Sequence, residues 1–219
     1  MRKHPFTVGL ATLLATAIAC AAAWAAVPVP VTLSPKSSLS VSGTSTLHAW
    51  TCTTNRTEVR VTRDDAATTG DLAALVKAGH VQSVDVTVPV LTLHSEKSGL
   101  DKNMYKALKA DEHPTITVRL DRFTAPVAGT AADTLAVQAE GTITITGNTQ
   151  PVVLTGRLHP GGGGLWLEGQ HTLKMTQFGI QPPKLMMGTI KVGDPVTIRY
   201  QLQFTNREAA GDAAAASGL

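Results

Sequence analysis

The stretch His94–Val118, HSEKSGLDKNMYKALKADEHPTITV, is where the strand-like pattern of this chain is interrupted by a helical one. Leu100, Met104 and Leu108 recur at every fourth position, which is the spacing of one face of a helix. Pro114 ends the pattern, because the residue before a proline is pushed toward an extended conformation. The stretch therefore predicts one short amphipathic helix.

Strand-like alternation flanks this helix on both sides. Valines alternate with mostly polar residues over 82–91, and apolar residues recur at every second position of 115–123. Ser98, followed by Asp101 three positions later, indicates a capping box at the start of the helix. A short helix between two strands most simply plugs or lids the end of a β-barrel.

The rest of the chain adds further strand patterns and one more short helix. Residues 71–78 have a helical pattern that Gly79 would end. Alternating or apolar strand patterns cover 38–54, 58–63, 135–145, 152–154, 165–173 and 196–204. About eight or nine strands, apolar on one side, predict an all-β protein, either a sandwich or an antiparallel barrel. A barrel of about eight strands can hold one small ligand inside.

The two ends of the chain differ in composition from its middle. Residues 1–25 have a basic start, an apolar run and Ala23-Trp24-Ala25, the features of a secretory signal peptide cleaved after Ala25. The alternative is a lipoprotein signal with Cys20 as the acylated residue. Residues 26–37 are Pro-rich and indicate a linker, 38–205 the barrel domain, and the Ala/Gly-rich 206–219 a disordered tail.

Charge and cysteine content limit the partners of the exported chain. Loss of Arg2 and Lys3 from the 19 basic residues leaves 17 against 16 acidic ones, a net charge of +1. With no basic run left, nucleic acid is not an expected partner. No later apolar stretch approaches the ~20 residues of a membrane span. Without Cys20, Cys52 has no internal disulfide partner, and we expect it to be buried.

The motifs of common enzymes and metal sites are absent from the sequence. His48, Trp50 and Cys52 share one face of a strand, but His48 and Cys52 would lie about 13 Å apart along it. That separation argues against a Cys–His nucleophilic pair and leaves a polar or redox face, or simple packing against the core. The histidines show no metal-ligand spacing, so no metal site is expected.

The segment 178–188, FGIQPPKLMMG, is apolar and Met-rich, yet its prolines and glycines prevent a regular strand or helix. Apolar loops of this kind can cap a cavity, and methionine adapts to flexible apolar ligands. We expect it to meet the helix at 98–108 over the mouth of the barrel; the alternative is a loop folded onto the outer surface.

Four segments together resemble the YceI-like family. They are GTSTLHAWTC, PVLTLHSEKSGLDKNMYKALKADEHPTITVRL, AEGTITITGNTQPVVL and LKMTQFGIQPPKLMMGTIKVGDPVTIRYQL, which occur in the family's order within about 38–204. The resemblance implies a lipocalin-like antiparallel barrel in the periplasm. It further implies that the interior binds a polyisoprenoid or a similar long-chain amphiphile, such as an isoprenoid quinone. It brings no catalytic motif.

From the apolar faces and the resemblance together we expect a set of side chains to line or lid the ligand site. They are Val86, Val88, Leu100, Met104, Leu108, Ile116, Val118, Ile143, Leu154, Leu173, Phe178, Leu185, Met186, Ile198 and Tyr200. No covalent cofactor is expected, and the lipid or quinone would be held without a bond. A transient membrane contact fits this function, while a monomer and a dimer both stay open. The competing functions are a redox- or haem-linked protein that works with a membrane electron-transfer partner, and a structural binder with a filled barrel.

Overall fold

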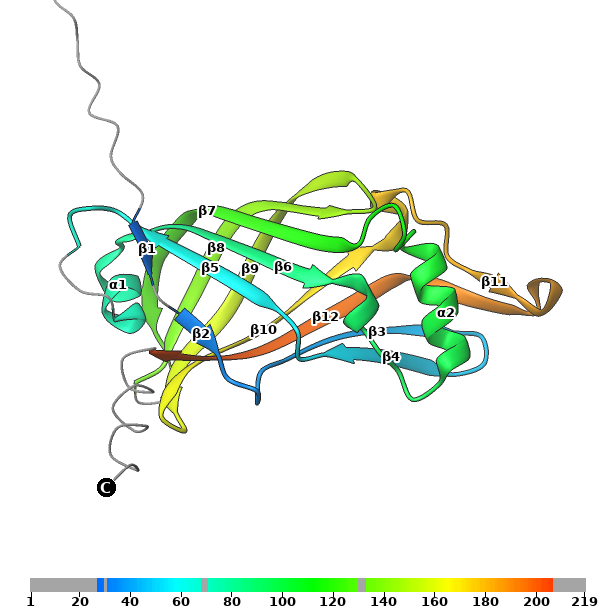
Figure 1. Cartoon of the computed structure of the whole chain (residues 1–219), viewed down its shortest axis with the longest axis horizontal. Coiled ribbons are helices and arrows are strands. Elements are labelled where there is room, and N and C mark those ends of the chain that lie inside the picture. The colour runs from blue at the N-terminus through cyan, green and yellow to red at the C-terminus, as the bar shows by residue number, and fades with distance from the viewer. Residues whose placement is uncertain (1–26, 30, 68–70, 130–132, 207–219) are drawn as a thin grey trace, which may run out of the picture.

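The computed structural model describes residues 27–29, 31–67, 71–129 and 133–206 (Figure 1). The predicted signal peptide with Cys20, and the tail beyond Asn206, lie outside these residues. Within them lie β1 (Val27–Val29), β2 (Val31–Leu33), β3 (Ser38–Ser45), β4 (Ala49–Thr54), β5 (Glu58–Arg63), α1 (Leu72–Ala78), β6 (Val81–Pro89), η1 (Val90–Thr92), α2 (Ser98–Ala107), β7 (Thr115–Ala128), β8 (Leu135–Ile145), β9 (Asn148–Gly161), β10 (Gly164–Lys174), η2 (Met175–Phe178), β11 (Lys184–Leu185), η3 (Met186–Gly188) and β12 (Ile190–Asn206).

The strands form one antiparallel sheet that curls around an apolar interior. Its order is β1-β5-β6-β7-β8-β9-β10-β12-β3-β4, with β2 and β11 as additional partners of β12. From β5 to β10 the order follows the chain, since each strand pairs with the next. The long β12 then returns beside β10 and also pairs with β3, so the last and first parts of the domain are joined. The all-β barrel prediction is confirmed, although the described residues form a sheet of 12 strands rather than about eight.

The segment predicted to be an N-terminal linker is instead part of the barrel wall. Val29 of β1 pairs with Val61 of β5, and Leu33 of β2 pairs with Phe204 of β12. The segment therefore lies between β5 and β12, which do not pair with each other. Proline cannot donate to a strand ladder, but a position at the edge of a sheet tolerates it. The linker prediction was wrong because proline content alone does not distinguish a linker from an edge strand.

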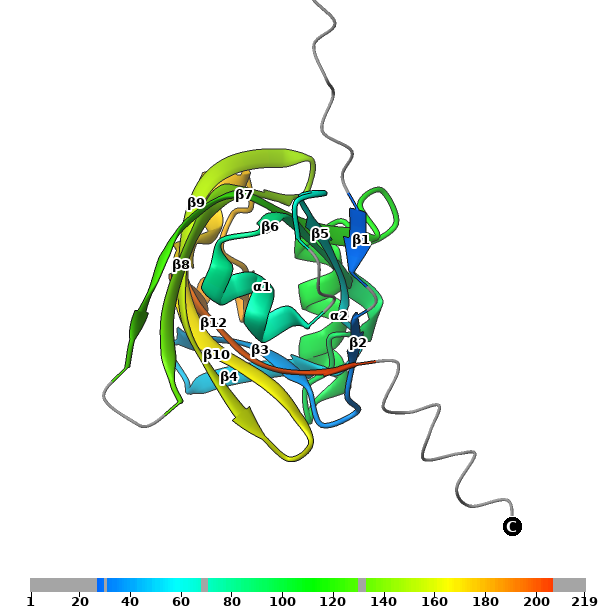
Figure 2. The ribbon, with the colours of Figure 1, turned by 90° about the vertical axis from the view of Figure 1, so that its left-hand side faces the viewer.

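Helix α1 lies in the opening at one end of the barrel, as Figure 2 shows. The Asp71 carboxylate accepts hydrogen bonds from the backbone N–H groups of Ala73 (2.7 Å) and Ala74 (3.1 Å). Gly79 ends the helix in the left-handed conformation at φ 73°, as the sequence predicted. Leu75 is fully buried in a cluster that includes residues of β12, so α1 closes this end with apolar side chains.

Helix α2 lies at the opposite end of the barrel (Figure 1). The residues of α2 agree with the predicted helix, but the side-chain contacts at its N-terminus do not. The N-cap is Lys97, which makes no side-chain cap, and the Asp101 carboxylate accepts a hydrogen bond from the N–H of Ser95 instead (2.8 Å). The predicted capping box at Ser98 was therefore wrong. Asp101 orders the loop that leads into the helix, where the backbone of His94 forms a bridge with Thr53 of β4.

Candidate ligand-binding site

A cavity of about 500 Å³ occupies the interior of the barrel. Its walls are the inward faces of the strands, because alternate side chains of a strand point to the same side of the sheet. On β8, for example, Ile143 and Ile145 line the cavity, while Thr144 between them is turned away. The lining is dominated by aliphatic side chains, so the cavity offers an apolar ligand little to hydrogen-bond with and much surface to cover.

Most of the predicted ligand-contact residues lie on the wall of this cavity. Those are Val86, Val88, Leu100, Met104, Leu108, Ile116, Val118, Ile143, Leu154, Leu173, Ile198 and Tyr200, together with His48 and Trp50. The apolar stripe of α2 thus faces the interior from one end, while the remaining residues come from strands that lie far apart in the sequence. The period-2 pattern explains this agreement, since it assigns each apolar residue of a strand to the inner face.

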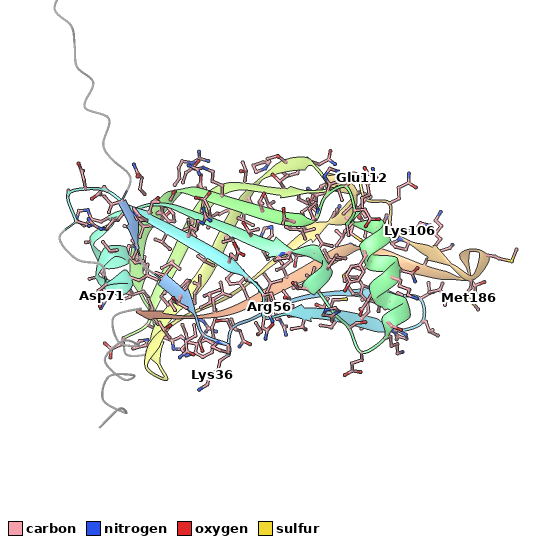
Figure 3. All side chains as sticks on the ribbon, viewed as in Figure 1. Lys36, Arg56, Asp71, Lys106, Glu112 and Met186 are labelled. Carbon is pink, nitrogen blue, oxygen red and sulfur yellow. The ribbon has the colours of Figure 1, made fainter. Side chains whose placement is uncertain are left out.

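Two residues of the predicted lid are not part of the cavity. Phe178 is 2% exposed in the packed core, where its carbonyl oxygen accepts hydrogen bonds from Thr146 Oγ1 (2.6 Å) and Asn148 Nδ2 (2.9 Å). Met186 is 72% exposed and projects from the tip of a hairpin, as Figure 3 shows. The side chain of Leu185 lies outside the described part of the structure.

The lid prediction failed at Met186 because its segment pairs with the start of β12. Lys184 and Leu185 of β11 face Lys191 and Ile190, which forms a hairpin that carries η3 beyond the end of the barrel. Ile180 and Pro183 line the cavity in place of the methionines. The segment 178–188 therefore contributes Ile180 and Pro183 to the cavity wall, while its two methionines extend away from the cavity.

Sequence reasoning missed about two thirds of the residues that line the cavity. The missed apolar residues include Leu39, Val41, Val59, Val84, Leu93, Leu120, Val137, Ala139, Ile145, Val152, Leu167, Ile180, Val192, Val196, Leu202 and Phe204. Many of them follow the same alternation as the residues that were predicted. A consistent inward assignment of every strand would have found most of these residues without the structure; Leu93 and Ile180 lie outside the strands and carry no such signal.

The cavity reaches the surface at the α2 end. Apart from Thr155, its exposed lining residues are Leu47 and His48 in the β3–β4 turn and Lys97, Gly99 and Asn103 around the start of α2. Pro183 and Ile190, at the base of the β11–β12 hairpin, complete this rim. The mouth therefore lies between one turn, one helix start and one hairpin. Polar groups gather there, whereas the closed end near α1 is lined by Leu202 and Phe204.

Two titratable side chains in the inner part of the cavity, His171 and Tyr200, are uncharged at neutral pH. Burial lowers the pKa of His171, which favours the uncharged imidazole. Burial also raises the pKa of Tyr200 to about 12, and its hydroxyl donates a hydrogen bond to the Thr155 carbonyl oxygen (2.6 Å). The inner part of the cavity thus carries no charge from these two groups, which suits an uncharged hydrocarbon chain.

The face formed by His48, Trp50 and Cys52 does not act as one surface. His48 and Trp50 line the cavity, but Cys52 is fully buried outside it. Burial raises the pKa of the Cys52 thiol to about 11, with a smaller contribution from the charge of Asp101, so the thiol is protonated. The arrangement therefore gives the redox- or haem-linked alternative no support.

The described side chains also form no metal site: nowhere among them do three His, Cys, Asp or Glu residues come together in a way that could hold an ion. Nor does any described helix have the length and apolar character needed to cross a membrane. Among the described residues, the apolar cavity is the structural feature that points to a function.

An antiparallel barrel with an apolar interior and a helix at each end defines a lipocalin-like protein. The chain belongs to the YceI-like domain family, whose model matches residues 32–204. This confirms the resemblance seen in the sequence and places β2 at the start of the domain. None of the curated proteins matches the chain.

Several solved structures share this fold, and two of them illustrate the similarity to this chain. BcnA from Burkholderia cenocepacia has a TM-score of 0.59 at 15% identity, over 78% of this chain and 99% of that one. A polyisoprenoid-binding domain from Saccharophagus degradans, implicated in plant cell wall breakdown, has a TM-score of 0.58 at 11% identity, over 81% and 99%. At such identities the similarity establishes the fold, and the ligand has to be argued from this chain's own cavity.

Proposed function

We propose that this chain is a periplasmic binding or carrier protein that holds a polyisoprenoid or a similar long-chain amphiphile, such as an isoprenoid quinone, inside its barrel. The observation that carries the proposal is the apolar cavity of about 500 Å³, closed by α1 and open beside α2. The fold shared with a polyisoprenoid-binding domain of another organism supports the same ligand class. The signal-like start of the sequence supports export.

The physical basis of binding is the removal of hydrocarbon from water. Each buried CH₂ contributes about 0.8 kcal/mol, so a long chain can bind tightly without any hydrogen bond. The polar end of an amphiphile would stay at the mouth, where His48, Lys97 and Asn103 offer hydrogen-bond donors. The cavity therefore suits an amphiphile whose chain points inward toward α1.

The same lining supports binding without catalysis. Of the described residues, those that line the cavity include no Asp, Glu or Cys. General acid–base chemistry needs a positioned titratable group near its working pH. Burial shifts the pKa of His171 down and that of Tyr200 up, away from neutrality, and the other titratable lining residues, His48 and Lys97, lie at the exposed mouth. A carrier that must release its ligand unchanged requires none of these groups.

Organic extraction of the exported protein, followed by mass spectrometry, tests the proposal. We expect a polyprenyl compound or an isoprenoid quinone at close to one molecule per chain. An empty cavity, or a small polar ligand in near-stoichiometric amount, would refute the carrier function. Intact mass of the same sample reports the start of the chain: a start at residue 26 agrees with signal peptide cleavage, whereas a diacylated Cys20 would establish the lipoprotein alternative.

Ligand affinity should fall in acid because of His171. Burial holds the pKa of His171 in the folded protein below the ordinary value of 6.5, so the imidazole in the cavity is protonated only as the pH falls below that value. A charge inside the cavity opposes an apolar ligand. We expect a fluorescent long-chain probe to bind several-fold more weakly near pH 5 than near pH 7.5, by titration at both values.

His171→Leu should remove most of this pH dependence, because the cavity then carries no imidazole. His159→Gln is the matched control, since His159 does not line the cavity and its ring lies 3.9 Å from Glu168. If the two variants have the same pH profile, His171 is not the responsible group.

A further inference from the structure

The open end of the barrel carries exposed apolar side chains on two tips. Met187 is fully exposed and Met186 is 72% exposed at the tip of the β11–β12 hairpin, and Leu47 is 66% exposed in the β3–β4 turn. Figure 3 shows Met186 at the far tip of the molecule on the α2 side. Leu47 also lines the cavity, so this apolar surface is continuous with the mouth.

The two tips are joined by hydrogen bonds through Thr46. Its backbone N–H donates to the Lys191 carbonyl oxygen (3.0 Å), and its hydroxyl donates to the Thr189 carbonyl oxygen (3.2 Å) while it accepts from the Lys191 N–H (3.2 Å). Leu47 follows Thr46 directly, and Thr189 in turn donates its N–H to the Met186 carbonyl oxygen (3.1 Å). The apolar residues of both tips thus belong to one ordered surface.

The backbone at the hairpin tip is of a kind that side chains usually avoid. Met186 and Met187 have φ angles of 51° and 56°, in the left-handed region that favours glycine, asparagine and aspartate. Two large apolar side chains are therefore held in water by an unfavourable backbone conformation. Neither contributes to the core or the cavity, so a function outside the folded chain is the better explanation.

The charges around these tips are mainly positive. The segments that surround the mouth carry the exposed Lys97, Lys102, Lys184 and Lys191. Against them stand Glu96, which is exposed, and Asp101, which is buried beneath the start of α2. Apolar tips beside lysines are the combination that favours the headgroup region of a bilayer with anionic lipids, because the tips enter the interface while the lysines contact headgroups.

We propose that this end of the molecule is a docking surface for an anionic lipid bilayer, formed by Leu47, Met186 and Met187 and flanked by Lys184 and Lys191. The inference rests on the proposed carrier function for its purpose: a docked mouth would let an amphiphile move between bilayer and cavity without crossing water. The docking surface itself is inferred from the exposed apolar side chains at the tips, the left-handed backbone of the hairpin tip and the lysines beside it.

Co-flotation of the exported protein with vesicles tests the proposal. One set contains phosphatidylethanolamine and phosphatidylglycerol, and the other contains phosphatidylcholine alone. We expect binding to the anionic set, weakened by salt, and much less binding to the neutral set. The double variant M186N/M187N places asparagine, which tolerates the left-handed conformation, at both positions. It should reduce binding about tenfold, because it removes two apolar side chains from the interface.

The matched control is Val127→Asn, which removes an apolar side chain that is 65% exposed near the opposite end of β7. Binding like that of the unaltered protein is expected for this variant. The proposal is overturned if the unaltered protein does not bind the vesicles. It is also overturned if M186N/M187N binds them as well as the unaltered protein does, or if both variants lose binding equally. Equal binding to phosphatidylcholine, or binding that requires a membrane protein in the vesicles, would overturn it as well.

Probe binding by delipidated M186N/M187N separates the docking surface from the cavity. Because neither methionine lines the cavity, the delipidated variant should bind a soluble fluorescent long-chain probe as tightly as the unaltered protein does, and its melting temperature should not fall. If the unaltered protein carries no lipid but still binds anionic vesicles through these tips, the carrier function fails and the docking surface stands.

Discussion

Replacement of Met104 by glutamate should empty the cavity while leaving the barrel folded. Met104 lies on the apolar stripe of α2 and lines the cavity near its mouth. A carboxylate there must either be desolvated by the bound chain or hold water in the mouth, and both oppose an apolar ligand. We expect the lipid-to-protein ratio, measured by extraction and mass spectrometry, to fall at least about tenfold.

The barrel should survive this change because its strands do not depend on α2 for their hydrogen bonds. Each strand pairs with its neighbours along the sheet, and α2 covers one end. Lys106→Glu is the matched control, since it changes charge on the same helix at an exposed position outside the cavity. A lower melting temperature with a normal lipid ratio in Met104→Glu would mean that the stripe serves packing and does not retain the ligand.

Gly141→Ala should be the most destabilising small substitution in the barrel. A Cβ atom at position 141 of β8 would lie 1.9 Å from the Arg119 carbonyl oxygen and 2.8 Å from the Leu120 Cα of β7. These are backbone atoms, so no side-chain rotation can relieve the clash. The two strands come this close where their register shifts between Leu120 and Arg122. We expect a loss of about 3 kcal/mol in the free energy of unfolding by urea titration, or failure to fold.

Gly99→Ala is the control for this substitution. Gly99 lies in the first turn of α2, and an added Cβ there would have no heavy atom within 4 Å. Alanine is favoured over glycine in a helix, so the variant should be unchanged or more stable, by at most about 1 kcal/mol. Equal urea midpoints for the two variants would show that β7 and β8 separate to accept the methyl group.

Gly141 and Met104 illustrate which structural features sequence periodicity can predict and which it cannot. Alternation alone placed Ile143 on the inner face of β8, and a spacing of four placed Met104 on the inner face of α2. It could not show that Gly141 faces backbone atoms of β7, because that contact depends on the register between two strands. A glycine within a strand pattern suggests a bulge or a close approach of backbone, but it does not show which atoms of the partner strand lie there.

Local periodicity by itself determined the strand faces, both α-helices and the apolar character of the interior, because each depends on residues a few positions apart. The tertiary structure decided the features that depend on pairing between distant segments. The return of β12 makes β2 a strand of the wall rather than part of a linker, and its pairing with β11 carries Met186 away from the cavity. Cys52 is separated from the cavity face of Trp50 for the same kind of reason, since the chain around His94 and α2 folds back toward β4. No local pattern encodes such contacts, because their partners lie tens of residues away and meet only when the sheet curls closed.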